Sequence, residues 1–372
     1  MNDTYKDLIY LLSCAVNGIT ADKARTETMD LEKLYTLAKF HTVRAAVCIS
    51  LERAEINHAE FHEAYKKAIR KNIYLDMERA AITEDFEQQG IWYMPLKGAL
   101  LKELYPENGM REMSDNDVLF DASKRQQVKK TMLAHGYVTE GEDFGHHDVY
   151  MKPPVLNFEL HTALFGKGHS EVFNRYYADT KRLMRLDDGS KYGYHLSDED
   201  FYVFMTAHEY KHFSNGGTGI RSLLDCFVYC KYKGNTLDWK YIEEQCKQLE
   251  ISDYEKKRKK LADKIFSSDI FPELSDKEQE MLRLYLTAGT YGTYERAVQK
   301  ALNKQSKTKY ILTNLFPSVN HMRRSVKFVD KFPLLYPVGI IYRWGRILIK
   351  YRNLLSIVLK EMKNDKKKVK NS

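Results

Sequence analysis

The sequence predicts an α+β protein in which a small mixed β-sheet core lies between an N-terminal and a C-terminal helical region. Two observations predict this order. The first 94 residues contain no proline and only two glycines, Gly18 and Gly90, so helices are favoured there. Short apolar or alternating segments follow at 91–96, 116–120 and 155–161, and these are typical of strands.

The 372 residues are enough for two or three structural units. We expect an N-terminal helical region at 1–85, the mixed core at 86–190, a C-terminal helical domain at 191–333, and a basic amphipathic helix with a lysine-rich end at 334–372. Apolar residues at near-helical spacing predict a long helix over 58–89, which Gly90 is placed to end. Further helices are expected at 123–135, 197–213, 220–232 and 239–249.

Composition excludes several classes of protein. With 43% apolar residues, the chain is not collagen-like, mucin-like or wholly disordered. Five cysteines without a CxxC pair indicate neither a disulfide framework nor a thiolate zinc site, and they suit a reducing cytoplasm. The apolar segment 8–16 is expected in an amphipathic first helix rather than in a signal peptide. No segment approaches the roughly 18 apolar residues of a membrane span, so no integral membrane segment is expected.

Charge is distributed unevenly. Residues 300–372 contain 18 Lys and Arg but only three acids, whereas the preceding residues contain more acids than bases. This asymmetry favours an anionic partner. A predicted helix at 340–358 has an apolar stripe and a separate basic face with Arg343, Arg346 and Lys350. The sequence favours packing of this helix on its own domain, and weak contact with an anionic membrane or a nucleic acid is the second interpretation.

The strongest candidate site is the run Ser114-Asp115-Asn116-Asp117 at the start of the second predicted strand. Residues i and i+2 of a strand point to the same side, so Asp115 and Asp117 would project together. Two close carboxylates repel each other, and Mg²⁺, which prefers oxygen ligands, would relieve that repulsion. Such pairs also occur on surface strands and turns without a metal.

Glu159 lies at an alternating position of the third predicted strand, and His161 shares its face. If the second and third strands are neighbours, Glu159 adds a third carboxylate. Three carboxylates on rigid strands can hold two metal ions for an in-line displacement at phosphorus. His161 then either lies beside the site or is a buried, hydrogen-bonded histidine.

Phosphate-binding candidates lie on both sides of this run. Lys97-Gly98 stands where a predicted strand gives way to a helix, and a glycine there lets backbone N–H groups approach an anion. Lys97 adds a positive charge, and Arg111 would add a planar guanidinium. Arg221 follows a glycine-rich segment at 216–219, which either presents a helix N-terminus to phosphate or is a plain turn.

These motifs together resemble an uncharacterised bacterial nucleotidyltransferase family of the DNA-polymerase-β-like superfamily. The resemblance is carried by Leu96-Lys-Gly-Ala-Leu-Leu, Tyr105-Pro, Gly109-Met-Arg111 and Asp115-Asn-Asp117-Val-Leu-Phe. It continues through Phe158-Glu-Leu-His161, His208, His212-Phe, Gly219-Ile-Arg221 and Leu224-Asp225. It departs from the superfamily at Lys97-Gly98, where a Gly-Ser pair is usual, and at Asn116, where an aliphatic residue is more usual.

The resemblance implies a nucleotidyltransferase core at 86–190 with a two-ion Mg²⁺ site. Asp115, Asp117 and Glu159 would hold the metal, and Glu159 would also serve as general base. The nucleotide would be bound by Lys97, Gly98, Arg111, Ser114 and Arg221. The implied reaction moves a nucleoside monophosphate from ATP or another NTP to an unidentified acceptor, which is a protein, an RNA or a small molecule.

Two alternatives stay open. The run His208-Glu209-Tyr210-Lys211-His212 matches HExxH, in which two histidines share a zinc ion and the glutamate is the general base of a peptidase. The extended form of that motif needs Gly at 215 and His at 218, where this chain has Asn215 and Thr218. Magnesium is therefore favoured over zinc. The other alternative is a non-catalytic relative that binds nucleotide.

Overall fold

The computed structural model describes residues 3–141, 147–166, 170–289, 307–319, 322–323 and 326–350. The chain divides into two compact units, and the first contains residues 1–211 and 218–290. The second unit contains residues 212–217 and 291–372. A small sheet flanked by many helices confirms the predicted α+β class, while the expected boundaries at 85, 190 and 333 stay predictions.

The N-terminal helical region is confirmed. It consists of α1 (Asp3–Asn17), α2 (Lys23–Glu27), α3 (Leu31–His41), α4 (Arg44–Arg53) and α5 (Ala59–Gln89). The apolar segment 8–16 is buried throughout in α1. The long helix ends as expected, because Gly90 adopts a left-handed conformation with φ 67° and donates its N–H to the last turn of α5.

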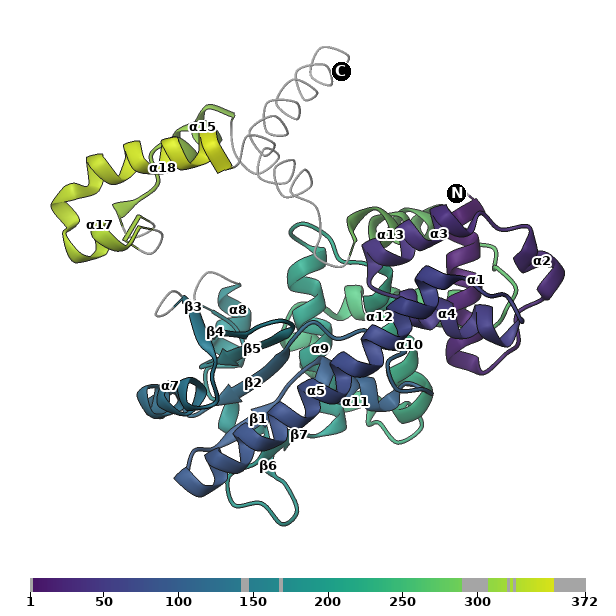
Figure 1. The fold of residues 1–372 in the computed structure, drawn as a ribbon, viewed down its shortest axis with the longest axis horizontal. Coiled ribbons are helices and arrows are strands. Elements are labelled where there is room, and N and C mark those ends of the chain that lie inside the picture. Colours follow the sequence, from purple (N-terminus) through teal and green to yellow (C-terminus); the bar gives the residue numbers. More distant parts are fainter. Residues whose placement is uncertain are drawn as a thin grey trace. The chain divides into compact units, whose positions relative to one another are not determined.

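A five-stranded sheet forms the core, with the strand order β1-β2-β5-β4-β3 (Figure 1). Its strands are β1 (Tyr93–Pro95), β2 (Asn116–Phe120), β3 (Val138–Gly141), β4 (His147–Lys152) and β5 (Leu156–His161). β2 and β5 run parallel, and the other neighbours are antiparallel. Sequence patterns predict β1, β2 and β5. β4 lies where a polar loop is expected. In the structure its Asp148 and Tyr150 are buried and alternate with less buried residues.

The two faces of the sheet pack against different helices. α5 and α7 (Arg125–Ala134) cover one face through a cluster that includes Ile82, Phe86, Met132, Phe158 and Leu160. Leu119 of β2 points to the other face, where it joins a second cluster with residues of α8 (Glu171–Tyr176) and α9 (Asp198–Phe213). Because side chains alternate along a strand, Asp117 and Glu159 belong to this second face.

Short elements connect these layers. α6 (Gly98–Leu101) continues into the turn η1 (Lys102–Leu104), and η2 (Ala122–Lys124) precedes α7. After α8 come η3 (Thr180–Leu183) and a separate hairpin of β6 (Met184–Leu186) and β7 (Tyr194–Leu196). The helix expected after Lys97-Gly98 is therefore only four residues long before it tightens into a 3₁₀ turn.

Helices α9, α10 (Ile220–Lys233) and α11 (Trp239–Gln248) are confirmed close to their predicted limits. They are followed by α12 (Ser252–Phe266) and α13 (Asp276–Ala288), for which the sequence gives no separate limits. The second unit contains α15 (Lys307–Leu315), α17 (Lys327–Lys331), η4 (Pro333–Leu335) and α18 (Tyr336–Lys350). The helix predicted at 340–358 thus starts earlier, and residues 351–358 lie outside the described residues. In the part of the chain that the structure describes, no helix has both the length and the apolar character needed to cross a membrane.

Candidate active site

The carboxylates of the predicted metal site meet at the start of β2. The parallel register of β2 and β5 sets Asp117 directly beside Glu159. His161 follows on the same face of β5, with its Nε2 atom 3.8 Å from Oε2 of Glu159. Asp115 directly precedes β2 and is half-buried. The adjacency of the two strands, on which the third carboxylate depends, is therefore confirmed.

Asp117 is buried and accepts two strong hydrogen bonds. Nζ of Lys97 lies 2.6 Å from Oδ1 of Asp117, and Nε2 of His161 lies 2.7 Å from the same oxygen. Burial alone would raise the pKa of Asp117, but the Lys97 charge and the His161 hydrogen bond outweigh it, so that this pKa is lowered. Asp117 therefore remains a carboxylate at neutral pH.

The other two carboxyls titrate differently. Burial, followed by the charges of Asp117 and Glu159, raises the pKa of Asp115 to about 7. Burial and the charge of Asp117 also raise the pKa of Glu159. The three groups repel one another as the sequence predicts, because the low-dielectric surroundings strengthen each interaction. One carboxyl with a lowered pKa therefore lies beside two with raised pKa values, and a bound cation would stabilise the ionised form of all three.

Lys97 is held in an unusual backbone conformation. Its φ of 51° and ψ of −116° are rare for a residue with a side chain, and it stands at the turn between β1 and α6. Conformations of this kind cost about 1–3 kcal/mol and persist where the surroundings enforce them. Burial would lower the pKa of Lys97, but the charge of Asp117 and its hydrogen bond raise it, with further help from Glu159 and Asp115. Lys97 therefore enters the site as a cation.

Gly98 and Arg111 pack against each other. A Cβ atom on Gly98 would lie 2.6 Å from Nη1 of Arg111 and 2.7 Å from Cε of Met113, so no side chain fits here without a shift. Arg111 is buried and forms a bidentate pair with Asp225 of α10, with N–O distances of 2.8 and 2.9 Å. The hydroxyl of Tyr105 donates to the same carboxylate at 2.7 Å. The Arg111 guanidinium thus has a carboxylate partner inside the protein.

Arg221 also connects α10 to the loop before β2. Its Nη1 atom donates to the backbone oxygen of Glu112 at 3.1 Å, and its charge lowers the pKa of Asp115 against the raising effect of burial. The Glu112 carboxylate accepts from the backbone N–H groups of Arg44 and Ala45 at the start of α4. Ser114 is half-buried directly before Asp115. The structure brings Lys97 and Arg221 within electrostatic reach of the carboxylates.

The structure accounts for Asn116 at a position where the superfamily usually has an aliphatic residue. It is fully buried on the α5 face of the sheet, where its Nδ2 atom donates to the backbone oxygen of Leu75 at 2.8 Å. Nη1 of Arg79 donates to its Oδ1 atom at 3.0 Å. Because both polar ends are bonded to α5, the amide locks the long helix to the strand that carries Asp117.

Two residues of the site are not predicted from the sequence. Lys211 of α9 is half-buried; burial and the Lys97 charge lower its pKa to about 8, against opposing effects of Glu159 and Asp117. His147 of β4 pairs opposite His161, with ring centroids 5.3 Å apart. Burial lowers the pKa of both histidines, to about 4 for His161. Lys211 lies within the HEYKH run, but the HExxH motif assigns roles only to His208, Glu209 and His212.

Glu209 of that run is part of a buried network. Its carboxylate accepts from Nη1 of Arg258 at 2.7 Å, and from the hydroxyls of Tyr254 and Tyr285 at 2.7 and 2.6 Å. Arg258 is fully buried and also donates to Oγ1 of Thr206 at 2.9 Å. Glu209 therefore stabilises the packing of α9 on α12 and α13 and is not available as a general base. This removes the catalytic group that the zinc-peptidase alternative requires.

Metal-ligand geometry favours the carboxylate site. Among the described residues, three groups of side chains bring potential ligand atoms within 4.8 Å of one another, and none of these groups includes His208 or His212. One group consists of Asp117, Glu159 and His161. Its oxygen donors, with Asp115 nearby, fit a hard divalent cation such as Mg²⁺. Because Lys97 and His161 both bind Oδ1 of Asp117, a cation would meet Oδ2 or displace Lys97.

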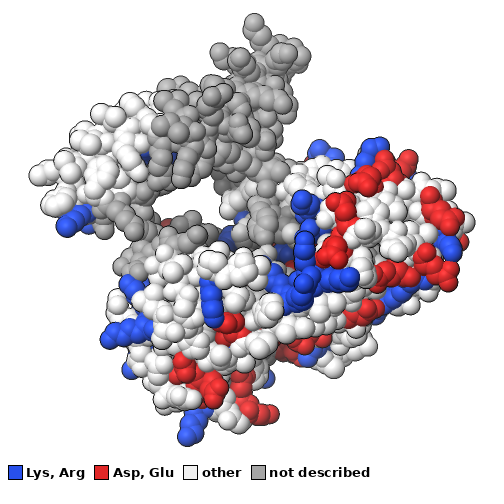
Figure 2. Space-filling model, in the orientation of Figure 1, with Lys and Arg blue, Asp and Glu red and all other residues white. Residues whose placement is uncertain are grey.

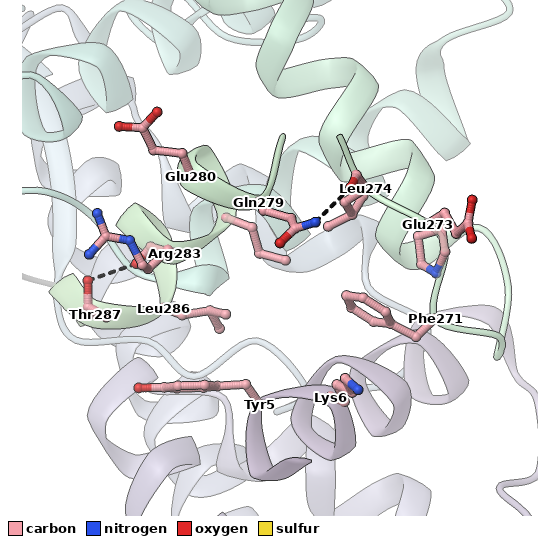
Figure 3. Close-up of a pocket in the computed structure, with 12 residues that line it drawn as sticks. Tyr5, Lys6, Phe271, Glu273, Leu274, Gln279, Glu280, Arg283, Leu286 and Thr287 are labelled. Carbon is pink, nitrogen blue, oxygen red and sulfur yellow. Dashed lines mark hydrogen bonds between the residues drawn. The ribbon is translucent and has the colours of Figure 1, made fainter. Parts of the chain in front are cut away.

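A cavity of about 800 Å³ lies elsewhere in the first unit (Figure 3). Tyr5 and Lys6 of α1 line it on one side, and Phe271, Leu274 and residues of α13 line it on the other. Gln279 donates to the backbone oxygen of Leu274 at its wall, at 2.8 Å. None of the site residues contributes to this cavity, and its mixed lining contains no convergent set of catalytic groups.

Comparison with known proteins agrees with the geometry. A family model described as an uncharacterised nucleotidyltransferase matches residues 27–267. The match contains all the residues of the carboxylate site, whereas residues 291–372 of the second unit lie beyond it. No curated protein and no solved structure gave a significant match.

Proposed function

The chain belongs to this family of nucleotidyltransferases, and on that premise we propose that it is a Mg²⁺-dependent enzyme that transfers a nucleoside monophosphate from an NTP. The observation that carries the proposal is the register of β2 and β5, which sets Asp117 beside Glu159 with Asp115 one step before the strand. Asp115, Asp117 and Glu159 would hold the metal. Bound there, Mg²⁺ would neutralise charge that develops on the phosphates.

Lys97 and Arg221 are proposed to bind the phosphates. Lys97 lies 2.6 Å from Asp117, so its ammonium group would move only a short distance to meet an oxygen of a triphosphate that approaches the carboxylates. Arg221 would bring a second cation from α10. Ser114 and the backbone at Gly98 would add hydrogen bonds. Arg111 is proposed to position this loop through Asp225, because its guanidinium is buried in that pair.

Glu159 is proposed to accept the proton of the acceptor. It is the more exposed partner of Asp117, with 30% of its side chain accessible against 9% for Asp117. Its raised pKa brings it closer to neutrality, which suits a general base. As the acceptor oxygen or nitrogen bonds to the α-phosphorus, its proton passes to Glu159 and pyrophosphate leaves. Burial lowers the pKa of Lys211 to about 8, and the charges of Glu159 and Asp117 act on it, so Lys211 is proposed to contact the triphosphate or the pyrophosphate.

Positive charge near the site supports an anionic substrate. Figure 2 shows Lys and Arg side chains gathered over α5, a helix whose sequence includes Lys66, Lys67, Arg70 and Lys71. Burial lowers the pKa of Lys71, and the charge of Asp115 opposes this change, so the ammonium group lies within electrostatic reach of the site. This arrangement would raise the local concentration of a triphosphate.

The test follows the label of each NTP. The full chain is incubated with Mg²⁺ and ATP, CTP, GTP or UTP labelled at the α-phosphate, against protein, RNA and small-molecule acceptors. We expect transfer from at least one NTP, lost in the Asp115→Ala/Asp117→Ala variant and kept in Asp253→Ala, which removes an exposed aspartate of α12. Transfer that survives in the double variant would overturn the proposal.

A non-catalytic nucleotide-binding relative is the second candidate. It is favoured by the position of Lys97, whose ammonium group already neutralises Asp117 where the superfamily has a Gly-Ser pair. This candidate predicts nucleotide binding without transfer to any acceptor. Equilibrium binding of each NTP, measured beside the transfer assay, separates the two.

A further inference from the structure

The second unit presents an unusual amount of apolar surface. Ten of the twenty large apolar side chains that are exposed among the described residues belong to it, although it contributes far fewer of those residues than the first unit. Leu334 of η4 is 96% exposed, and Ile341 of α18 is 66% exposed. Val338 and Tyr342 of α18 are also exposed. Positions 338, 341 and 342 share one face of the helix, so the apolar side chains form a stripe.

The opposite face of α18 fixes this orientation. Ile340 packs in a small core with Met322, Val326 and Val329. A Cβ atom on Gly339 would lie 2.4 Å from Cγ2 of Val329, so α18 approaches this core closely at Gly339. The helix therefore has its own packed side, and Val338 and Ile341 form a separate outer face, with Tyr342 at its edge beside Phe328. The sequence-based preference for a helix packed through its apolar stripe accounts for Ile340 and Trp344 but not for the exposed Val338 and Ile341.

Charge identifies the kind of partner that covers the stripe. Residues 307–350 contain nine Lys and Arg and one acid, Asp330. Lys309, Arg323 and Lys331 are exposed in the same unit. A unit whose exposed side chains are both apolar and basic suits the boundary of an anionic lipid bilayer, where acyl chains meet negatively charged headgroups. A nucleic acid would satisfy the cations but would leave the aliphatic groups of Leu334, Val338 and Ile341 without a matching surface.

We propose that the second unit binds the surface of an anionic membrane through η4 and α18. The described part of α18 contains Arg343, Arg346 and Lys350, and charged side chains are costly inside the hydrocarbon core, so the helix is expected to lie along the interface. Leu334, Val338 and Ile341 enter the boundary of the acyl chains, and the basic side chains meet the headgroups. Residues 291–372 lie beyond the family match, so this surface is a property of the present chain in addition to nucleotidyl transfer.

The experiment uses the full chain and lipid vesicles. Sedimentation with vesicles of phosphatidylcholine alone is compared with sedimentation with vesicles that also contain phosphatidylglycerol. We expect binding to the anionic vesicles that weakens with added salt. Val338→Glu/Ile341→Glu should lower the affinity about tenfold or more, because it places two charges where apolar groups are buried. Arg323→Glu/Lys331→Glu should also lower it about tenfold or more.

Controls separate these effects from net charge and from unfolding. Lys240→Glu/Lys247→Glu changes the net charge equally on α11 of the first unit, and Ile270→Glu replaces an apolar side chain that is 74% exposed there. Both should bind vesicles like the unaltered chain. Failure of the unaltered chain to bind anionic vesicles at low salt, or full binding by Val338→Glu/Ile341→Glu, would overturn the proposal. Binding to RNA that depends on Arg323 and Lys331 but not on Ile341, with no vesicle binding, would assign a nucleic acid instead.

Discussion

Replacement of Asp225 by alanine tests whether Arg111 positions the loop that leads to the carboxylate site. Asp225 accepts two N–H groups of Arg111, at 2.8 and 2.9 Å, and the hydroxyl of Tyr105, at 2.7 Å. Alanine would leave a buried guanidinium without a counter-charge. Removal of one partner of such a buried pair costs about 3–5 kcal/mol. We therefore expect Asp225→Ala to lower the free energy of unfolding of the first unit by about that amount.

A double variant distinguishes an unpaired charge from a general loss of packing. Arg111→Met/Asp225→Leu removes both charges and keeps apolar volume, so it should regain much of the stability lost in Asp225→Ala. Urea unfolding followed by circular dichroism measures both variants. A cost of less than about 1 kcal/mol for Asp225→Ala, or a double variant no more stable than the single one, would show that the Arg111–Asp225 pair does not hold this loop. NTP affinity of the folded double variant then reports whether Arg111 also contacts the nucleotide.

Three further predictions concern neighbouring groups. Glu209→Gln should lower the free energy of unfolding by about 3 kcal/mol, because it leaves buried Arg258 without a carboxylate partner. The metal content of the protein, measured by atomic emission, should not change. Loss of zinc in this variant would contradict the structural role of Glu209. The pKa of Asp115 is raised to about 7, so the folded state holds a proton there that the unfolded state releases near pH 4. This group therefore stabilises the folded protein at low pH, and its contribution is lost as the pH rises through 7. Thermal melts from pH 4 to 8 without added metal should therefore fall less steeply for Asp115→Asn than for the unaltered chain, and equal slopes would contradict the assignment. Gly98→Ala should cost about 1–3 kcal/mol, because its Cβ atom would overlap Arg111 and Met113, whereas Gly345→Ala, with open space around it, should cost nothing; equal unfolding midpoints for the two would argue against this packing.

Local patterns in the sequence account for the elements that form from neighbouring residues. Helix α5 and its end at Gly90, the strands β1, β2 and β5, and helices α9 to α11 follow from periodicity and from glycine chemistry within each segment. The sequence does not predict β4. Its six residues include His147, Asp148 and Lys152, which are typical of a polar loop, and the strand forms through pairing with β3 and β5. The β6–β7 hairpin is too short to leave a periodic signal.

The residues of the candidate site also differ in whether the sequence alone can identify them. Asp115 and Asp117 can be selected from the sequence because both stand on one short segment, and their spacing decides their common side. Lys211 cannot, because its contribution depends on how α9 packs against the second face of the sheet. The same holds for Arg111, which by residue type alone is as suited to phosphate as to a carboxylate. Only the position of α10 supplies the carboxylate of Asp225, 114 residues away.

The sequence by itself determined the α+β class, the DxD pair, the conditional role of Glu159 and the basic C-terminal region, since each depends on residue type and local spacing. The tertiary structure decided which cations reach the carboxylates, that Glu209 binds Arg258 in the core, and that Val338 and Ile341 of α18 stay exposed. The physical reason is common to all three. Burial and the distance between charges set pKa values and ion pairs, and both quantities arise only when segments remote in the chain are packed together.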